Sequence, residues 1–155
     1  MRRNQQVTIY ALAVLLISCQ PKQVPVGAPV PEPLAEFSQA LAVAESGVAE
    51  TALTLMELEQ AKLVKREEIA PIVDAVKRAA KAGAQTAKAL KGLKALSDAD
   101  RKNLAKLMAP MTDSLSEALD RHILNLGADA QVKVKALLAA LVSTIKLTQA
   151  ILVVR

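Results

Sequence analysis

The sequence predicts an all-α protein, and three observations carry that prediction. Hydrophobic residues make up 52% of the 155 residues and aromatic residues only 1%, so the apolar content is mostly Ala, Leu and Val. Ala and Leu are strong helix formers, and glycine is scarce with five copies. Four segments after residue 33 place apolar residues three and four positions apart, which is the period of a helix with one buried face. Short connections between these segments predict an up-down helical bundle of about four helices. The alternative is a pair of long helical hairpins that close only in a dimer.

The first predicted helix covers about residues 33–62 and has an acidic outer face. Pro33 suits a first helical turn. No Lys or Arg occurs between Gln23 and Ala61, so every charge between these two residues is a glutamate. Its apolar residues alternate at spacings of four and three, the pattern of a bundle seam. The predicted buried stripe is Phe37, Leu41, Ala44, Val48, Thr51, Leu55 and Leu58.

The second predicted helix covers about residues 67–91 and is basic. We expect Pro71 in its first turn and Gly92 as its C-terminal cap. The predicted buried stripe is small in the middle, which lets two helix backbones approach closely: Ile69, Ile72, Val76, Ala79, Gly83, Ala87 and Leu90. A different face carries the four lysines Lys77, Lys81, Lys88 and Lys91.

The third predicted helix covers about residues 98–125. Ser97 is a good N-cap, and Asp100 three residues later resembles the partner of a capping box. Pro110 predicts a kink or a break near Met108. The predicted buried stripe is Leu104, Leu107, Met108, Met111, Leu115, Leu119 and Ile123.

The fourth predicted helix covers about residues 128–154, after a turn at Gly127, and is the most apolar. Its predicted buried stripe is Val134, Leu138, Leu141, Ile145, Thr148 and Leu152, widened by Leu137 and Val142. Residues 136–154 could alternatively cross a membrane. Because Lys146 lies near the middle of that stretch and a central Lys is costly in a bilayer, we favour a helix of the bundle core.

The first 19 residues have the organisation of a targeting segment. Arg2 and Arg3 precede an apolar stretch of 11 residues, Val7 to Ile17, which is short for a membrane span. The tetrapeptide Leu16-Ile17-Ser18-Cys19 then resembles the lipobox of bacterial lipoproteins. The resemblance covers only these 19 residues. The alternative is a plain signal anchor with an incidental cysteine.

The resemblance implies that the Cys19 thiol receives a diacylglyceryl group and that a signal peptidase, recognising Leu16, Ile17 and Ser18, cuts before Cys19. Two or more acyl chains give stable anchoring to a membrane. Residues 1–18 would then be removed. Gln20 after the cysteine, in place of Asp, favours the outer membrane facing the periplasm in a Gram-negative host.

Residues 19–33 form the predicted tether between the lipidated cysteine and a helical domain at residues 34–155. Five prolines, at positions 21, 25, 29, 31 and 33, preclude a helix there and favour a semi-rigid spacer of about 3.1 Å per residue. The alternative is a proline-rich ligand for a partner domain.

Charge is distributed unevenly along the chain. Removing Arg2 and Arg3 from the 20 basic residues leaves 18, against 15 acidic residues, so the mature net charge is +3. The segment from Lys62 to Lys106, however, contains 12 basic residues and only five acidic ones. We expect the lysines of the second helix to pair with the acidic first helix. The alternative is contact with an anionic surface such as lipid headgroups, lipopolysaccharide or cell-wall polymer. Nucleic acid is disfavoured because aromatic residues for base stacking are missing.

The sequence offers little for catalysis, so we predict no enzymatic activity, no cofactor, no metal site and no small-molecule substrate. His122 is the single histidine and suits the C-terminal end of a helix. Asp113, Glu117 and Asp120 could hold a cation loosely, but such a row is more often a solvated face.

The sequence therefore predicts a lipid-anchored, non-enzymatic protein of the cell envelope. Its helical domain would bind another envelope protein or a second copy of itself. The alternative is a membrane-active or phage lysis-accessory lipoprotein that uses its basic and apolar helices.

Overall fold

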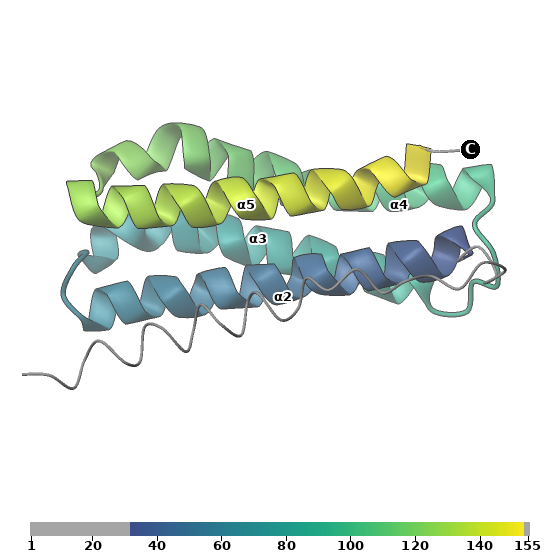
Figure 1. Cartoon of the computed structure of the whole chain (residues 1–155), viewed down its shortest axis with the longest axis horizontal. Helices are drawn as coiled ribbons and strands as arrows, with labels where there is room; N and C mark the ends of the chain where they lie inside the picture. The colour runs from purple at the N-terminus through teal and green to yellow at the C-terminus, as the bar shows by residue number, and fades with distance from the viewer. Residues whose placement is uncertain (1–31, 154–155) are drawn as a thin grey trace, which may run out of the picture. The chain divides into compact units, whose positions relative to one another are not determined.

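The computed structural model describes residues 32–153, and within them it contains four long helices and no strand (Figure 1). The helices are α2 (Pro33–Gln60), α3 (Arg66–Leu90), α4 (Asp98–Glu117) and α5 (Ala128–Val153). A π-helical turn, η1 (Ala118–His122), and a 3-10 turn, η2 (Ile123–Asn125), connect α4 to α5. The prediction of an all-α bundle is confirmed.

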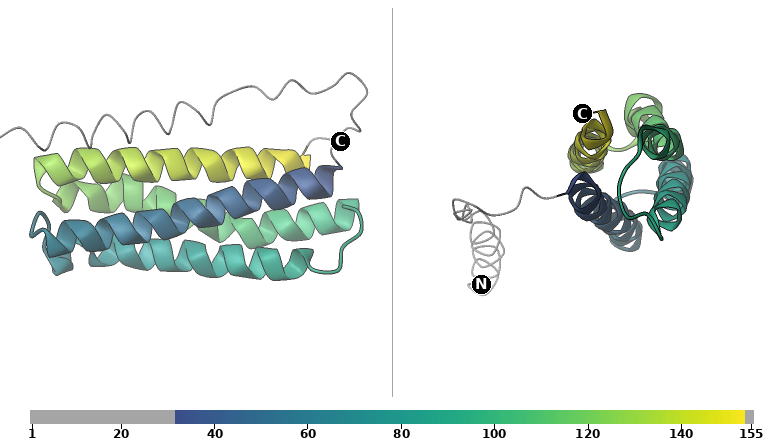
Figure 2. Two further views of the ribbon diagram at one scale, coloured as in Figure 1. Left: turned by 60° about the horizontal axis from the view of Figure 1, so that its bottom comes forward. Right: turned by 90° about the vertical axis from the view of Figure 1, so that its right-hand side faces the viewer.

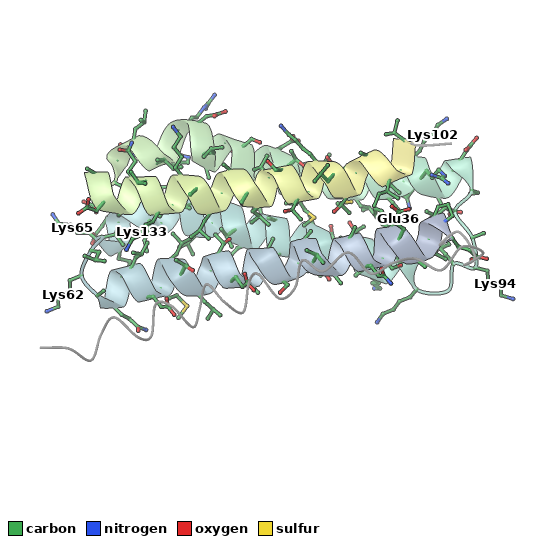
Figure 3. All side chains as sticks on the ribbon, viewed as in Figure 1. Glu36, Lys62, Lys65, Lys94, Lys102 and Lys133 are labelled. Atoms are coloured by element: carbon green, nitrogen blue, oxygen red, sulfur yellow. The ribbon has the colours of Figure 1, made fainter. Side chains whose placement is uncertain are left out.

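The four helices run up and down around one shared core. Both α2 and α4 pack against α3 and α5, which makes α2 and α4 diagonal partners. The end-on view in Figure 2 shows the helices surrounding a common centre. The beginning of α2 and the end of α5 lie at the same end of the bundle (Figure 1). Figure 3 shows Lys62 and Lys65 at the opposite end from Lys94 and Lys102.

The seams of α2 and α5 are those that the periodicity predicts. Every residue of the two predicted stripes is buried, and Val142 joins them, while Leu137 is half-buried. The two buried threonines of these seams are satisfied by carbonyls of their own helix. Thr51 donates to Gly47 at 2.8 Å, and Thr148 donates to Thr144 at 2.9 Å. Hydrogen bonding removes the penalty that a bare hydroxyl would cause in an apolar core.

The buried face of α3 is wider than predicted, and the faces of α3 and α4 are less sharply bounded. Ala75, Ala82 and Thr86 of α3 are buried although the predicted stripe omits them, because α2 and α4 cover α3 from two sides. Four predicted members are only half-buried: Ala87, Leu90, Leu107 and Leu119. Small residues therefore fill much of the space around α3.

The helix ends combine predicted and unexpected caps. Ser97 and Asp100 form the predicted capping box at the start of α4, and Gly92 follows α3 with a φ of 91°. Lys62 occupies the same left-handed region after α2, with a φ of 58°, although it is not a glycine. Pro71 is the sixth residue of α3, so the expectation of a first-turn proline there is wrong.

Of the kink or break predicted near Met108, the break is absent. Helix α4 runs without interruption from Asp98 to Glu117 and contains Pro110. Because proline has no backbone N–H, the carbonyl of Lys106, four residues earlier, has no helical hydrogen-bond partner. Pro110 is exposed, so this carbonyl lies on the solvent side of the helix. The irregular turn comes later, at η1, where Ala118 is buried.

Candidate functional site

The predicted lipidation site lies outside the described residues. This holds for Cys19 and for the recognition residues Leu16, Ile17 and Ser18. The predicted anionic-surface residues do belong to the described part of the chain. Lys77, Lys81 and Lys88 lie on α3 and Lys91 directly follows it, and all four are exposed. We call these four residues the lysine row.

The lysine row does not pair with α2, which corrects the predicted structural role. Within residues 32–153, the only ion pair of the row joins Lys77 Nζ to Asp74 Oδ1 at 3.6 Å, within α3 itself. Both side chains of this pair are mostly exposed, and such pairs contribute little to stability. The row therefore presents its charge to the surroundings of the bundle.

The glutamates of α2 explain why the expected pairing fails. Glu36, Glu50 and Glu57 recur at spacings of fourteen and seven, so they share one side of the helix. Glu50 lines a groove against α5, which identifies that side as the one turned away from α3. Figure 3 likewise shows Glu36 on the side of α2 that faces α5. These three glutamates and the lysine row thus point in different directions, whereas Glu45 lies on the side of α2 next to α3.

The side of α2 next to α3 carries an apolar strip beside Glu45. Its exposed members Ala42, Ala49 and Met56 recur every seven residues, so they share one side of the helix. Met56 is 52% exposed. This strip and the adjacent side of α3 border what we call the α2–α3 groove, where the two helices lie side by side (Figure 2).

The α2–α3 groove contains an apolar cavity of about 310 Å³. Its walls are formed by small or flexible apolar side chains of the two helices, and the buried Met111 of α4 contributes to its lining. Two charged residues complete the lining, Glu45 from α2 and Lys77 from α3. The cavity exists because alanines stand where larger residues would fill the space: Ala49, Ala52 and Ala80.

Glu45 divides this cavity from a second hollow of about 260 Å³ in the same groove. The second hollow lies toward the beginning of α2 and is lined by Ser38 and Ala42 on one side and by Lys91 on the other. Lys77 and Lys91 therefore both border the α2–α3 groove. Lys81 and Lys88, the other members of the lysine row, line neither hollow.

Another groove runs along the surface between α2 and α5. Its volume is about 360 Å³, and its lining includes Val43, Gly47 and Glu50 from α2 and Ala140 from α5. Val43 is 62% exposed, so apolar surface faces solvent here as well. This α2–α5 groove differs from the α2–α3 groove because its lining contains an acidic residue, Glu50, and no basic one.

Of the remaining titratable candidates, Glu117 forms ion pairs and His122 lies at a helix end, while Asp113 and Asp120 are exposed. Glu117 contacts Arg78 of α3 at 3.6 Å and Arg121 at 3.9 Å. His122 is the last residue of η1 and is half-buried. Across residues 32–153, no group of three His, Cys, Asp or Glu side chains could hold a metal ion.

Helix α5 is the one described helix that is long and apolar enough to cross a membrane. Only 33% of its most apolar window is buried in the bundle. Length and composition alone do not separate a membrane span from the core helix of a soluble protein, and the predicted seam of α5 is buried against α2 and α4.

The comparisons with known proteins assign this chain to no family: no family model, no curated protein and no solved structure matches it. The sequence did not predict the α2–α3 groove, although one signal in it is consistent with such a groove. Ala42, Ala49 and Met56 recur every seven residues as an uncharged exposed row on a helix whose charged residues are all acidic.

Proposed function

We propose that this protein is a lipid-anchored component of a bacterial cell envelope whose helical domain binds a partner and performs no catalysis. The observation that carries the proposal is Cys19 at the end of Leu16-Ile17-Ser18-Cys19, directly behind a basic start and an apolar stretch. A lone cysteine in an exported chain forms no internal disulfide, and acylation gives it a role.

The arrangement of the domain supports this proposal. The first helix of the described residues begins at Pro33, and the sequence from 20 to 33, a proline-rich stretch of 14 residues, follows the predicted lipid attachment site. The domain then offers exposed grooves between α2 and both of its neighbours, one with Lys77 in its lining and one with Glu50. Such grooves are surfaces for recognition, and an anchored bundle holds them at a membrane.

Metabolic labelling with a palmitate analogue, followed by membrane fractionation, tests the anchor. The wild-type chain is expected to carry the label and to sediment with membranes. Cys19→Ala should lose both properties, whereas Ser18→Ala, which keeps a small residue before the cysteine, should retain them. An unlabelled wild-type chain would show that the anchor is absent.

Purification in a mild detergent tests the interaction role. The proposal expects the anchored protein to bring down another envelope protein or a second copy of itself. A chain that is strictly monomeric and without a partner under these conditions would count against an interaction module, even if the lipid anchor were established.

A second candidate is a membrane-active or lysis-accessory lipoprotein, and the apolar character of α5 favours it. Exposed Leu147 and Val153, at 71% and 77%, add to the apolar outer surface of this helix. The basic lysine row could contribute attraction to anionic lipids. This candidate expects the protein to release dye from anionic vesicles, and intact vesicles would remove it.

A further inference from the structure

We infer that the cavity of the α2–α3 groove binds the hydrocarbon chain of an anionic single-chain amphiphile, such as a free fatty acid, with the acidic head beside Lys77. This inference goes beyond the anchor at Cys19 and does not depend on it. It rests on the shape of the cavity, on the chemistry of its walls and on the positions of its two charges.

The shape of the cavity favours a linear ligand. Its lining along α2 extends from Glu45 to Met56, which corresponds to about 16 Å at about 1.5 Å per residue. The volume of about 310 Å³ lies at the lower end of the range of ligand pockets. A space that is long for its volume accommodates an extended chain better than a compact ring system.

The walls of the cavity favour an aliphatic ligand. Apart from Glu45 and Lys77, the lining consists of valines, alanines and two methionines. Met56 is half-exposed at the rim, and Met111 is fully buried. Methionine adapts its shape readily because its side chain is flexible and polarizable. In the described part of the chain, no buried side-chain nitrogen or oxygen lacks a hydrogen-bond partner. A ligand in the cavity therefore needs no polar group to pair with a buried side chain.

The two charges orient the ligand. Glu45 closes the end of the cavity toward the beginning of α2, and its carboxylate repels an anionic head from that end. Lys77 lies in the lining contributed by α3, and its exposed side chain can turn toward a bound head. Its only ion-pair partner among residues 32–153 is the equally exposed Asp74, a weak competitor.

Photo-crosslinking of the full-length protein tests this inference. The chain is reconstituted in phosphatidylcholine vesicles and irradiated with dodecanoate that carries a diazirine at its terminal carbon. Modified peptides are then mapped by mass spectrometry. Labelling is expected to concentrate on residues 45–56 and 73–80. Labelling that is absent, or that falls mainly on α5, would overturn the inference.

Matched variants separate the cavity from the rest of the surface. Ala49→Phe fills the cavity and should reduce labelling roughly tenfold, because the chain loses several methylene contacts. Ala84→Phe is the control, since Ala84 is exposed on α3 and lines none of the hollows described above. Circular dichroism of both variants establishes that they fold. Equal labelling of the two variants would contradict the assigned site.

Competition with unlabelled compounds tests the head group. Dodecanoate should displace the probe more effectively than dodecanol does, and Lys77→Gln should reduce this preference roughly threefold. Lys88→Gln should leave the preference unchanged, because Lys88 does not line the cavity. No preference for dodecanoate in the wild type would overturn the role of Lys77. Association with anionic vesicles without displacement by dodecanoate would indicate a membrane-docking surface in place of an amphiphile site.

Discussion

Glu45 lies over Gly83, at the point where it divides the two hollows of the α2–α3 groove. A Cβ atom added to Gly83 would stand 3.2 Å from both the Cγ and the Oε1 atom of Glu45. The same Cβ would stand 3.4 Å from Cε of Met111, which is fully buried. The absence of a side chain at position 83 therefore makes room for a carboxylate between two helices.

Substitutions at Gly83 test this close approach. Gly83→Leu should lower the free energy of unfolding by about 2 kcal/mol, because overpacking of a close contact costs roughly 1–3 kcal/mol. Gly83→Ala should stay within about 1 kcal/mol of wild type, because its better helix propensity offsets the displacement of Glu45. Urea denaturation followed by circular dichroism measures both changes. Ala84→Leu, on the exposed side of α3, is the control and should have little effect; equal losses for both leucine variants would refute the close approach.

Lys62 and Gly92 form a second informative pair, because both have a positive φ after a helix. Lys62→Gly should stabilise the protein by about 1 kcal/mol, since a residue with a Cβ is strained in the left-handed region. Gly92→Ala should destabilise it by about the same amount, although no atom lies within 4 Å of the added Cβ. Thermal unfolding should show shifts of opposite sign, and shifts of the same sign would argue against backbone strain at these positions.

Pro110 should limit the stability of α4. Pro110→Ala restores the N–H that bonds to the carbonyl of Lys106, so we expect a gain of about 1–3 kcal/mol in the free energy of unfolding. Pro33→Ala serves as the control, because Pro33 is the first residue of α2 and its missing N–H has no helical partner to lose. Comparison of their denaturation midpoints distinguishes the two positions; a loss of stability on Pro110→Ala would show that proline is required there.

Ser97 should contribute to stability through the start of α4. The backbone N–H of Asp100 donates to Ser97 Oγ at 3.2 Å, and the backbone N–H of Ser97 donates to Asp100 Oδ2 at 3.1 Å. Ser97→Ala should cost about 1 kcal/mol, the usual effect of removing an N-cap hydroxyl. Ser46→Ala on the exposed surface of α2 is a suitable control, and equal denaturation midpoints for the two variants would contradict the capping role.

The helices and seams could be predicted because one periodic signal determines them. In α2, the stripe from Phe37 to Leu58 is buried residue by residue, since a single apolar face turns toward one core. The prediction for α3 was less complete because Ala75, Ala82 and Thr86 are small residues that become buried only when two neighbours cover the helix. Burial of small side chains depends on the arrangement of the helices, which periodicity alone does not specify.

The surfaces could be predicted less well than the core. An acidic helix followed by a basic one suggested pairing, but Glu50 lines the groove toward α5 while Lys77 lines the groove toward α2. The rotation of each helix about its axis decides which charges meet, and it is fixed by the apolar seams. The cavity lay beyond prediction for a related reason. It depends on Ala49, Ala52 and Ala80 facing one another across two helices, so no single segment reveals it.

An even number of antiparallel helices places the start of α2 and the end of α5 at one end of the domain (Figure 1). A protein held through residues before Pro33 would then be held at one end of a rod. The 28 residues of α2 give this rod a length of about 42 Å at about 1.5 Å per residue. The loop at Lys62 would therefore stand about 42 Å from the held end, while the hollow beside Lys91, which Ser38 and Ala42 also line, would lie close to it.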